Sequence, residues 1–301
     1  MKEFPNLSQW FDFIDYCDFN DCTKIELNMK KSLTSAEIEN LNINFAKYLC
    51  RLRCSEKKDI ELMYRAIDSG DSSCIPEDIK RRIILCFFYG FISDNKYSDT
   101  GDYSKSFDDD AIQGYMGECL YYLVREQYLK DEKKIIEPIK PKFYSKSPGI
   151  DFVEVRRDSN GFYMLIGEVK TTIGTISSRS HEIIEAFSLR ADKTFAEIYQ
   201  SLRGNPNLSE DPELLDFVNQ MNDIFYYIGS RINTKKKYSG VVNYCYAGQR
   251  IRDTVFSKFR DSLTDKVFDD PDCRRIKLIG IYNIGDNFCK VRDIIWNCLL
   301  T

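Results

Sequence analysis

The sequence contains a single histidine, His181, among its 301 residues. Zinc sites of the His-Glu-x-x-His type need two histidines on one helix, and HNH-type nucleases depend on histidine, so both classes are excluded. A Ser-His-acid triad would have to use His181, which lies in the polar stretch 177–182. We interpret His181 instead as a surface residue near the start of a helix.

Clustered cysteines are absent, although the chain has eleven cysteines in total. No Cys-x-x-Cys pair occurs, and the nearest pairs are Cys17 with Cys22 and Cys50 with Cys54. This spacing indicates neither a zinc site nor a disulfide framework. We therefore expect a protein of the reducing cytoplasm, in which several of these cysteines act as small apolar residues.

Long apolar runs and phosphate-binding glycine motifs are also missing. No apolar run reaches the roughly 18 residues of a spanning helix, and Met1 to Pro5 contain no apolar signal-peptide core. Neither Gly-x-x-x-x-Gly-Lys-Ser/Thr nor Gly-x-Gly-x-x-Gly occurs, so we expect no ATP-driven motor in this chain. Any motor would be a partner protein, and we expect no membrane partner.

The net charge of −4 gives no overall basic field for nucleic acid. One segment differs, because residues 231–260 contain eight Lys or Arg and a single acid. The candidate phosphate contacts in it are Lys235, Lys236, Lys237, Arg250 and Arg252. Such contacts would give affinity without reading a base sequence. A solvated loop explains a lysine run equally well, and both interpretations stay open.

Periodicity and turn residues predict the helices and strands. Ser35–Ile38 has the pattern of a helix cap, an apolar 3.6-residue period follows to Leu52, and the helical character continues through Met63. We expect further helices at about 76–91, 109–130, 179–203 and from 211 onward, and strands at 23–29, 135–139, 240–246 and 276–282. This order predicts an α/β (α+β) fold with a mixed central sheet flanked by helices.

A polar segment without periodicity, residues 95–110, separates two parts of the chain. We expect residues 1–100 to form a mainly helical N-terminal region, part of which could dock a partner. Residues 101–301 are expected to form the core that carries the chemistry.

The strongest chemical signal lies between Pro148 and Lys170. Two apolar runs flank Asp158-Ser159-Asn160-Gly161, and Asn-Gly is the strongest short hairpin signal. Asp151 opens the first run, and Glu168-Val169-Lys170 closes the second. Pairing across the turn would bring Asp151 to the end of the sheet where Glu168 lies. Residues 168 and 170 would share one face of their strand.

These residue types suit a metal-dependent hydrolase. The carboxylates of Asp151 and Glu168 are oxygen ligands of the kind that Mg²⁺ or Mn²⁺ prefers. The ammonium group of Lys170 could orient or deprotonate a water molecule. Two alternatives stay open, a charged ladder on a strand surface and a buried structural Glu–Lys ion pair.

Glu118 lies in the middle of the expected helix 109–130, shortly after Gly114 and Gly117. Two glycines in a helix cost roughly 1 kcal/mol each relative to alanine, so we expect close packing of this helix over the sheet to compensate. Such packing would direct Glu118 toward Asp151 and Glu168. The alternative is an ordinary surface glutamate beside a packing glycine.

A helix Glu, a strand Asp and a Glu-x-Lys strand, in this order, resemble the PD-(D/E)xK nuclease superfamily. The resemblance covers about 109–203 well and the later strands loosely. The superfamily often has proline directly before the aspartate, whereas here Gly149 and Ile150 stand between Pro148 and Asp151. The resemblance implies a nuclease-like core within residues 101–301 and DNA as the substrate.

The superfamily resemblance also implies a role for each site residue. Asp151 and Glu168 would coordinate Mg²⁺, with Mn²⁺ as a substitute, together with the Val169 carbonyl. Glu118 would complete the metal site directly or through water. Lys170 would position or deprotonate the attacking water. Tyr199-Gln200 stands where related nucleases often place a helper residue, and this is a weaker correspondence.

The longer signature is similar to one branch, the HamA family of nuclease subunits from the Hachiman antiphage defence system. It consists of Gly117-Glu118-Cys119-Leu120, Pro148-Gly149-Ile150-Asp151, Gly167-Glu168-Val169-Lys170 and a long helix. That family pairs with a helicase, HamB, so the resemblance implies a HamB-like helicase partner and control of DNA cleavage by it. Two alternatives remain, a catalytically silent scaffold or DNA-binding subunit with the nuclease fold, and a stand-alone restriction or repair nuclease.

Overall fold

The structure of this chain is a computed structural model. It describes residues 4–19, 22–54, 56–83, 109–128, 133–134, 152–158, 161–172, 203, 211–217, 219, 238–246, 275–282, 284 and 287–300.

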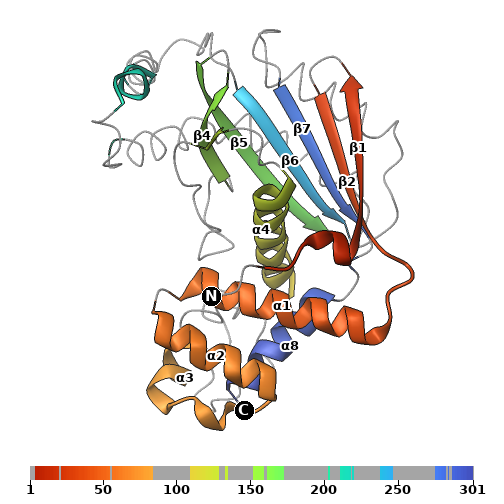
Figure 1. The fold of residues 1–301 in the computed structure, drawn as a ribbon, viewed down its shortest axis with the longest axis vertical. Helices are drawn as coiled ribbons and strands as arrows, with labels where there is room; N and C mark the ends of the chain where they lie inside the picture. The colour runs from red at the N-terminus through yellow and green to blue at the C-terminus, as the bar shows by residue number, and fades with distance from the viewer. Residues whose placement is uncertain are drawn as a thin grey trace.

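Within these ranges, seven strands form one sheet in the order β1-β2-β7-β6-β5-β4-β3 (Figure 1). The strands are β1 (Phe11–Phe19), β2 (Cys22–Met29), β3 (Lys133–Lys134), β4 (Phe152–Asp158), β5 (Gly161–Thr172), β6 (Tyr238–Tyr246) and β7 (Arg275–Tyr282). Strands β2, β7, β6 and β5 are parallel to one another. Strand β1 is antiparallel to β2 on one edge, and β4 and β3 continue antiparallel on the other edge. The sheet is therefore mixed, with a parallel centre.

Helices gather at one end of this sheet (Figure 1). The described helices are α1 (Ser35–Arg53), α2 (Lys57–Ser69), α3 (Glu77–Ile83), α4 (Asp109–Tyr128) and α8 (Asn287–Leu299), with 3₁₀ turns at Leu7–Gln9 and Ser72–Cys74. Residues 212–217 are also helical. Helix α8 packs against α1, α2 and α4, and α4 packs against β5. None of the helices in the described ranges is long and apolar enough to cross a membrane.

The N-cap of helix α1 lies one residue before Ser35, where the sequence pattern places it. Thr34 is the N-cap, and its hydroxyl accepts from the Glu37 amide at 3.3 Å. The Glu37 carboxylate accepts from the Thr34 amide at 2.7 Å, which completes a capping box. The expected helical character up to Met63 is confirmed, and it is divided between two helices, because α1 ends at Arg53 and α2 starts at Lys57.

The expected hairpin is present as an antiparallel pair of β4 and β5, with Asp158 opposite Gly161. The strands predicted at 23–29, 240–246 and 276–282 are confirmed as β2, β6 and β7. The helix predicted at 109–130 is confirmed as α4. The strand predicted at 135–139 lies outside the described residues, as does the helix predicted at 179–203 except for Arg203.

Both ends of the chain contribute to the same layers. Strand β2 pairs with β7 from Cys22 opposite Ile276 to Asn28 opposite Tyr282. The buried amide of Asn42 on α1 donates to Asn287 on α8 at 3.3 Å. The first 100 residues therefore supply two strands of the common sheet as well as helices. The division of the chain near residue 100 stays a prediction.

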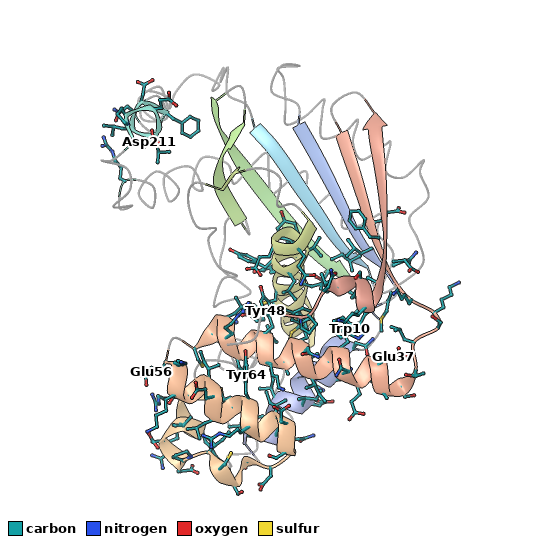
Figure 2. All side chains as sticks on the ribbon, viewed as in Figure 1. Trp10, Glu37, Tyr48, Glu56, Tyr64 and Asp211 are labelled. Atoms are coloured by element: carbon teal, nitrogen blue, oxygen red, sulfur yellow. The ribbon has the colours of Figure 1, made fainter. Side chains whose placement is uncertain are left out.

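The hydrophobic core lies where the helices meet the sheet. Trp10, only 2% exposed, sits at this junction and donates its indole N–H to the Glu37 carbonyl at 3.0 Å (Figure 2). Phe45, Met63 and Ile281 belong to the same cluster, which draws on α1, α2 and β7. The core therefore fixes the position of α4 relative to the sheet, on which the candidate site depends.

Candidate metal centre

Helix α4 carries Glu118 and packs against β5, the strand that holds the Glu-x-Lys sequence (Figure 1). Tyr115, Met116 and Cys119 of α4 are at most 3% exposed and belong to the main core. Every residue from Cys119 to Val124 is buried. A helix that is apolar on all sides packs inside the core rather than at the surface.

Glu118 is half-buried, and its Oε2 atom is shielded from solvent. Its negative charge is one of the influences that raise the pKa of the adjacent Cys119 thiol, after burial, which is the largest. A thiol with a raised pKa stays protonated at neutral pH, so Cys119 is unsuited to be a nucleophile or a metal ligand.

The packing of α4 does not explain Gly114. A methyl group added at Gly114 would meet no atom within 4 Å. The expectation that close approach to the sheet compensates for this glycine is therefore wrong at Gly114. Gly117, one turn further along, is buried.

Val169 is the part of Glu168-Val169-Lys170 whose side chain the structure describes. It is 7% exposed and belongs to the same core cluster as Tyr115 and Cys119 of α4. Because α4 also packs against β5, this part of the strand and α4 contribute to one core. For Glu168 and Lys170 the structure describes the backbone, which pairs with Val242 and Tyr244 of β6.

Asp151 lies outside the described residues. It directly precedes Phe152, the first residue of β4, and Phe152 pairs with Gly167 of β5. Gly167 in turn directly precedes Glu168. Asp151 and Glu168 are therefore the sequence neighbours of Phe152 and Gly167, which pair with each other across β4 and β5.

Thr171 is a neighbour that the sequence reasoning missed. It follows Lys170 on β5, and its Oγ1 atom is buried without a hydrogen-bond partner among the described residues. A buried hydroxyl of this kind is uncommon in a native structure. The sequence signal that could have identified Thr171 is its position directly after Glu168-Val169-Lys170 in an otherwise apolar strand.

Arg53 of α1 is tied to α4 one turn away from Glu118. Its Nε donates to the Tyr115 hydroxyl, and its guanidinium carbon lies 3.9 Å from the centre of the Tyr115 ring. Burial raises the pKa of Tyr115, and the Arg53 charge opposes that shift. The N-terminal helices are therefore linked directly to the helix that carries Glu118.

A metal centre needs several donors around one point. No group of three His, Cys, Asp or Glu able to hold a metal occurs among the residues that the structure describes. Asp151 and the Glu168 side chain are not among those residues. The donor set predicted from the sequence consists of carboxylates and a backbone carbonyl, and this chemistry fits Mg²⁺ or Mn²⁺.

The other residues that the sequence analysis singled out also lie outside the described part of the chain. These are Lys235, Lys236, Lys237, Arg250, Arg252, His181 and Tyr199-Gln200. Comparison of the whole chain with protein-family models and with curated proteins finds no match.

Proposed function

We propose that this chain is a Mg²⁺-dependent DNA endonuclease of the PD-(D/E)xK type, built on the α4 helix and the β4–β5 hairpin. One observation carries most of the proposal. The register of β4 against β5 pairs Phe152 with Gly167, the residues next to Asp151 and Glu168. A hairpin that pairs in this way supports the convergence of two acidic positions at one end of a sheet.

The residues would share the work of phosphodiester hydrolysis. Asp151, Glu168 and the Val169 carbonyl hold the metal ion, which when bound stabilises negative charge on the phosphate. Lys170 positions the attacking water or removes its proton. The DNA backbone is contacted by the basic segment that contains Lys235 and Arg250.

Glu118 has a supporting role in this proposal. It lies on helix α4, which packs against β5, the strand that contains Glu168 and Lys170. We propose that Glu118 completes the metal site through water, one of the two roles that the superfamily resemblance implies.

Cleavage of supercoiled plasmid DNA by the purified chain in Mg²⁺ tests the proposal. We expect Glu168→Ala and Asp151→Ala to abolish cleavage, and Lys170→Ala to slow it by about 10²–10⁴-fold, the range for a general acid or base. Glu118→Gln should slow it by about 10–100-fold, the range for a group that acts through a ligand. Glu126→Gln, an exposed change on the same helix, is the matched control. Equal cleavage by all variants would refute the mechanism.

We further propose that the chain works in the cytoplasm as the nuclease subunit of an antiphage defence complex, restrained by a HamB-like helicase partner. This rests on the resemblance to the HamA family. Adding the partner and DNA separately to the chain tests the restraint, because full activity of the lone subunit on intact duplex would contradict it.

A second candidate function is a nuclease-fold scaffold that binds DNA or a partner without cutting. The direct link from α1 to α4 through Arg53 and Tyr115 favours a structural role for part of the N-terminal region. DNA binding that does not depend on Mg²⁺, with no cleavage by the chain or by its partner complex, would support this alternative. A stand-alone restriction or repair nuclease would instead cut without any partner.

A further inference from the structure

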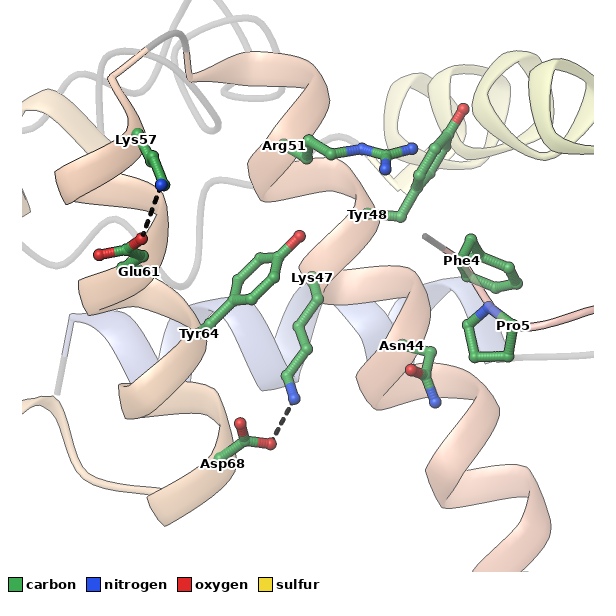
Figure 3. Close-up of a pocket in the computed structure, with 10 residues that line it drawn as sticks. All are labelled: Phe4, Pro5, Asn44, Lys47, Tyr48, Arg51, Lys57, Glu61, Tyr64 and Asp68. Atoms are coloured by element: carbon green, nitrogen blue, oxygen red, sulfur yellow. Dashed lines mark hydrogen bonds and ion pairs between the residues drawn. The ribbon is translucent and has the colours of Figure 1, made fainter. Parts of the chain in front are cut away.

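A pocket on the N-terminal helices lies outside the proposed nuclease site. Its volume is about 420 Å³, and it opens between α1, α2 and the segment before the first 3₁₀ turn (Figure 3). Asn44, Lys47, Tyr48 and Arg51 line it from α1, Lys57, Glu61, Tyr64 and Asp68 line it from α2, and Phe4 and Pro5 close one side. A pocket of this size suits a small ligand rather than a single ion.

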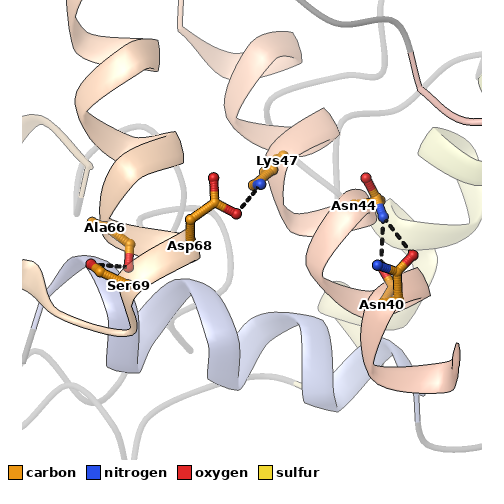
Figure 4. Close-up of polar contacts among 6 residues, drawn as sticks. All are labelled: Asn40, Asn44, Lys47, Ala66, Asp68 and Ser69. Atoms are coloured by element: carbon orange, nitrogen blue, oxygen red, sulfur yellow. Dashed lines mark hydrogen bonds and ion pairs between the residues drawn. The ribbon is translucent and has the colours of Figure 1, made fainter. Parts of the chain in front are cut away.

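Two of the three cations in the pocket have carboxylate partners. Lys47 forms an ion pair with Asp68, which joins α1 to α2 (Figure 4). Lys57 lies 3.9 Å from the Glu61 carboxylate, and both side chains are largely exposed. Asn44 donates to Asn40 at 2.8 and 3.0 Å, which fixes the amide at the opposite wall (Figure 4). These pairs leave one cation to account for.

That cation is Arg51. Among the described residues, no carboxylate forms an ion pair with Arg51. Its guanidinium carbon lies 5.2 Å from the centre of the Tyr48 ring, and the close-up shows the side chain reaching toward that ring (Figure 3). Stacking on an aromatic face orients the planar N–H fork and leaves its donors available to an anion. The five charged groups in the pocket sum to +1.

Tyr64 supplies a second donor on the facing helix. It is half-buried, and burial raises the pKa of its phenol, so the hydroxyl keeps its proton at neutral pH. Figure 3 shows the Tyr64 ring projecting from α2 toward α1, and Tyr64 and Arg51 both line the pocket. An anion in this space would meet a guanidinium from one helix and a phenol O–H from the other.

We propose that this pocket binds the phosphate group of a nucleotide, with Arg51 as its main contact. The planar fork of Arg51 matches phosphate oxygens, and the pocket's charge of +1 balances one phosphodiester. The Phe4, Pro5 and Tyr64 side chains supply apolar wall against which a sugar or base packs. A small carboxylate would make no contact with this apolar wall. A phosphate attached to a sugar and base contacts both the wall and Arg51, so it fits the pocket better.

A free nucleotide and a nucleic-acid strand present the same phosphate chemistry. Isothermal titration of the full chain separates them, with inorganic phosphate, AMP, ATP and a single-stranded DNA dodecamer as probes. EDTA is present throughout, so the result does not depend on the proposed nuclease site. An acidic peptide serves as the carboxylate probe.

Arg51→Gln and Arg65→Gln form a matched pair, because Arg65 is an exposed arginine outside the pocket with the same charge change. We expect Arg51→Gln to weaken phosphate-ligand binding by at least tenfold and Arg65→Gln to change it by less than twofold. Tyr64→Phe, which keeps the ring, should weaken it severalfold. Thermal unfolding of each variant confirms that it is folded.

Arg51-dependent binding of AMP alone identifies a free nucleotide, and Arg51-dependent binding of the dodecamer identifies a nucleic-acid strand; either supports the proposal. Three outcomes overturn it. These are no binding of any phosphate probe at millimolar concentration, equal weakening by Arg51→Gln and Arg65→Gln, and Arg51-dependent binding of the acidic peptide in preference to every phosphate probe.

Discussion

Two helix glycines in this chain have opposite roles, and substitutions separate them. Gly114 lies inside α4 with open space around its Cα. Because glycine in a helix interior costs about 0.5–1 kcal/mol relative to alanine, we predict that Gly114→Ala raises the free energy of unfolding by that amount. Urea denaturation followed by circular dichroism measures it.

Gly70 is the matched control. It ends α2 with φ of 68°, in the left-handed region that glycine tolerates. Gly70→Ala should lower the free energy of unfolding by about 1–2 kcal/mol, since a side chain strains this conformation although no atom obstructs it. A loss of stability in Gly114→Ala would instead show that neighbouring atoms obstruct a side chain at this position.

The capping box of α1 predicts a pH dependence. Hydrogen bonds from the Thr34 backbone and hydroxyl lower the pKa of Glu37 below its ordinary value of 4.5. A carboxyl group with a lowered pKa stabilises the fold fully above its unfolded value, and this contribution is lost as the pH falls through the folded value. The difference in Tm between wild type and Glu37→Ala should therefore be constant from about pH 7 to 5 and shrink below about pH 4.

Glu39, exposed in the same turn of α1, controls for general charge effects. Glu39→Ala should show no comparable change of Tm difference over this pH range. A Glu37→Ala difference that grows on acidification would mean that the carboxylate is not the capping species.

At the scale of elements, α1 and α4 are coupled through Arg53 and Tyr115. A double-mutant cycle of Arg53→Met and Tyr115→Phe should give a coupling free energy of about 1.5–3 kcal/mol, the range for hydrogen bonds to charged groups. Arg51→Met combined with Tyr115→Phe is the control cycle, with additive effects expected. Additivity in both cycles would remove the proposed link between these helices.

Local sequence signals, such as turn residues and continuous apolar runs, predicted several of the helices and strands. The Asn160-Gly161 turn located the β4–β5 hairpin, and continuous apolar runs located β6 and β7. The break between α1 and α2 has no such signal, since the N-cap of α2, Glu56, makes no side-chain capping bond. That break depends on tertiary packing, which a local pattern does not contain.

Helix α8 was missed altogether, although Val291, Ile295 and Leu299 are buried at helical spacing. In the candidate site, residue types and order suggested Asp151, Glu168 and Lys170, and the register of β4 supports their proximity. The position of Glu118 relative to the faces of β5 could not be predicted, because it depends on which face α4 covers. The open space beside Gly114 likewise results from tertiary packing, which the local sequence pattern does not contain.

At the scale of the whole molecule, the two ends of the chain share one sheet and one core. Strand β2 pairs with β7, and α8 packs against α1 and α2. We predict a single cooperative unfolding transition, with coincident curves from circular dichroism and from the fluorescence of Trp10 and Trp296. Residues 1–100 and 101–301 expressed separately should each lack a cooperative transition. Retention of the full-length midpoint by the 101–301 fragment would contradict this.

Divalent metal binding by the isolated chain tests the central claim most directly, because it does not require a partner or DNA. Titration with Mn²⁺, followed by electron paramagnetic resonance, should show binding in the wild type and in the Glu126→Gln control. Asp151→Asn and Glu168→Gln should each abolish it, while Lys170→Ala should retain it. Unchanged Mn²⁺ binding in both carboxylate variants would contradict the proposed metal centre and with it the proposed nuclease.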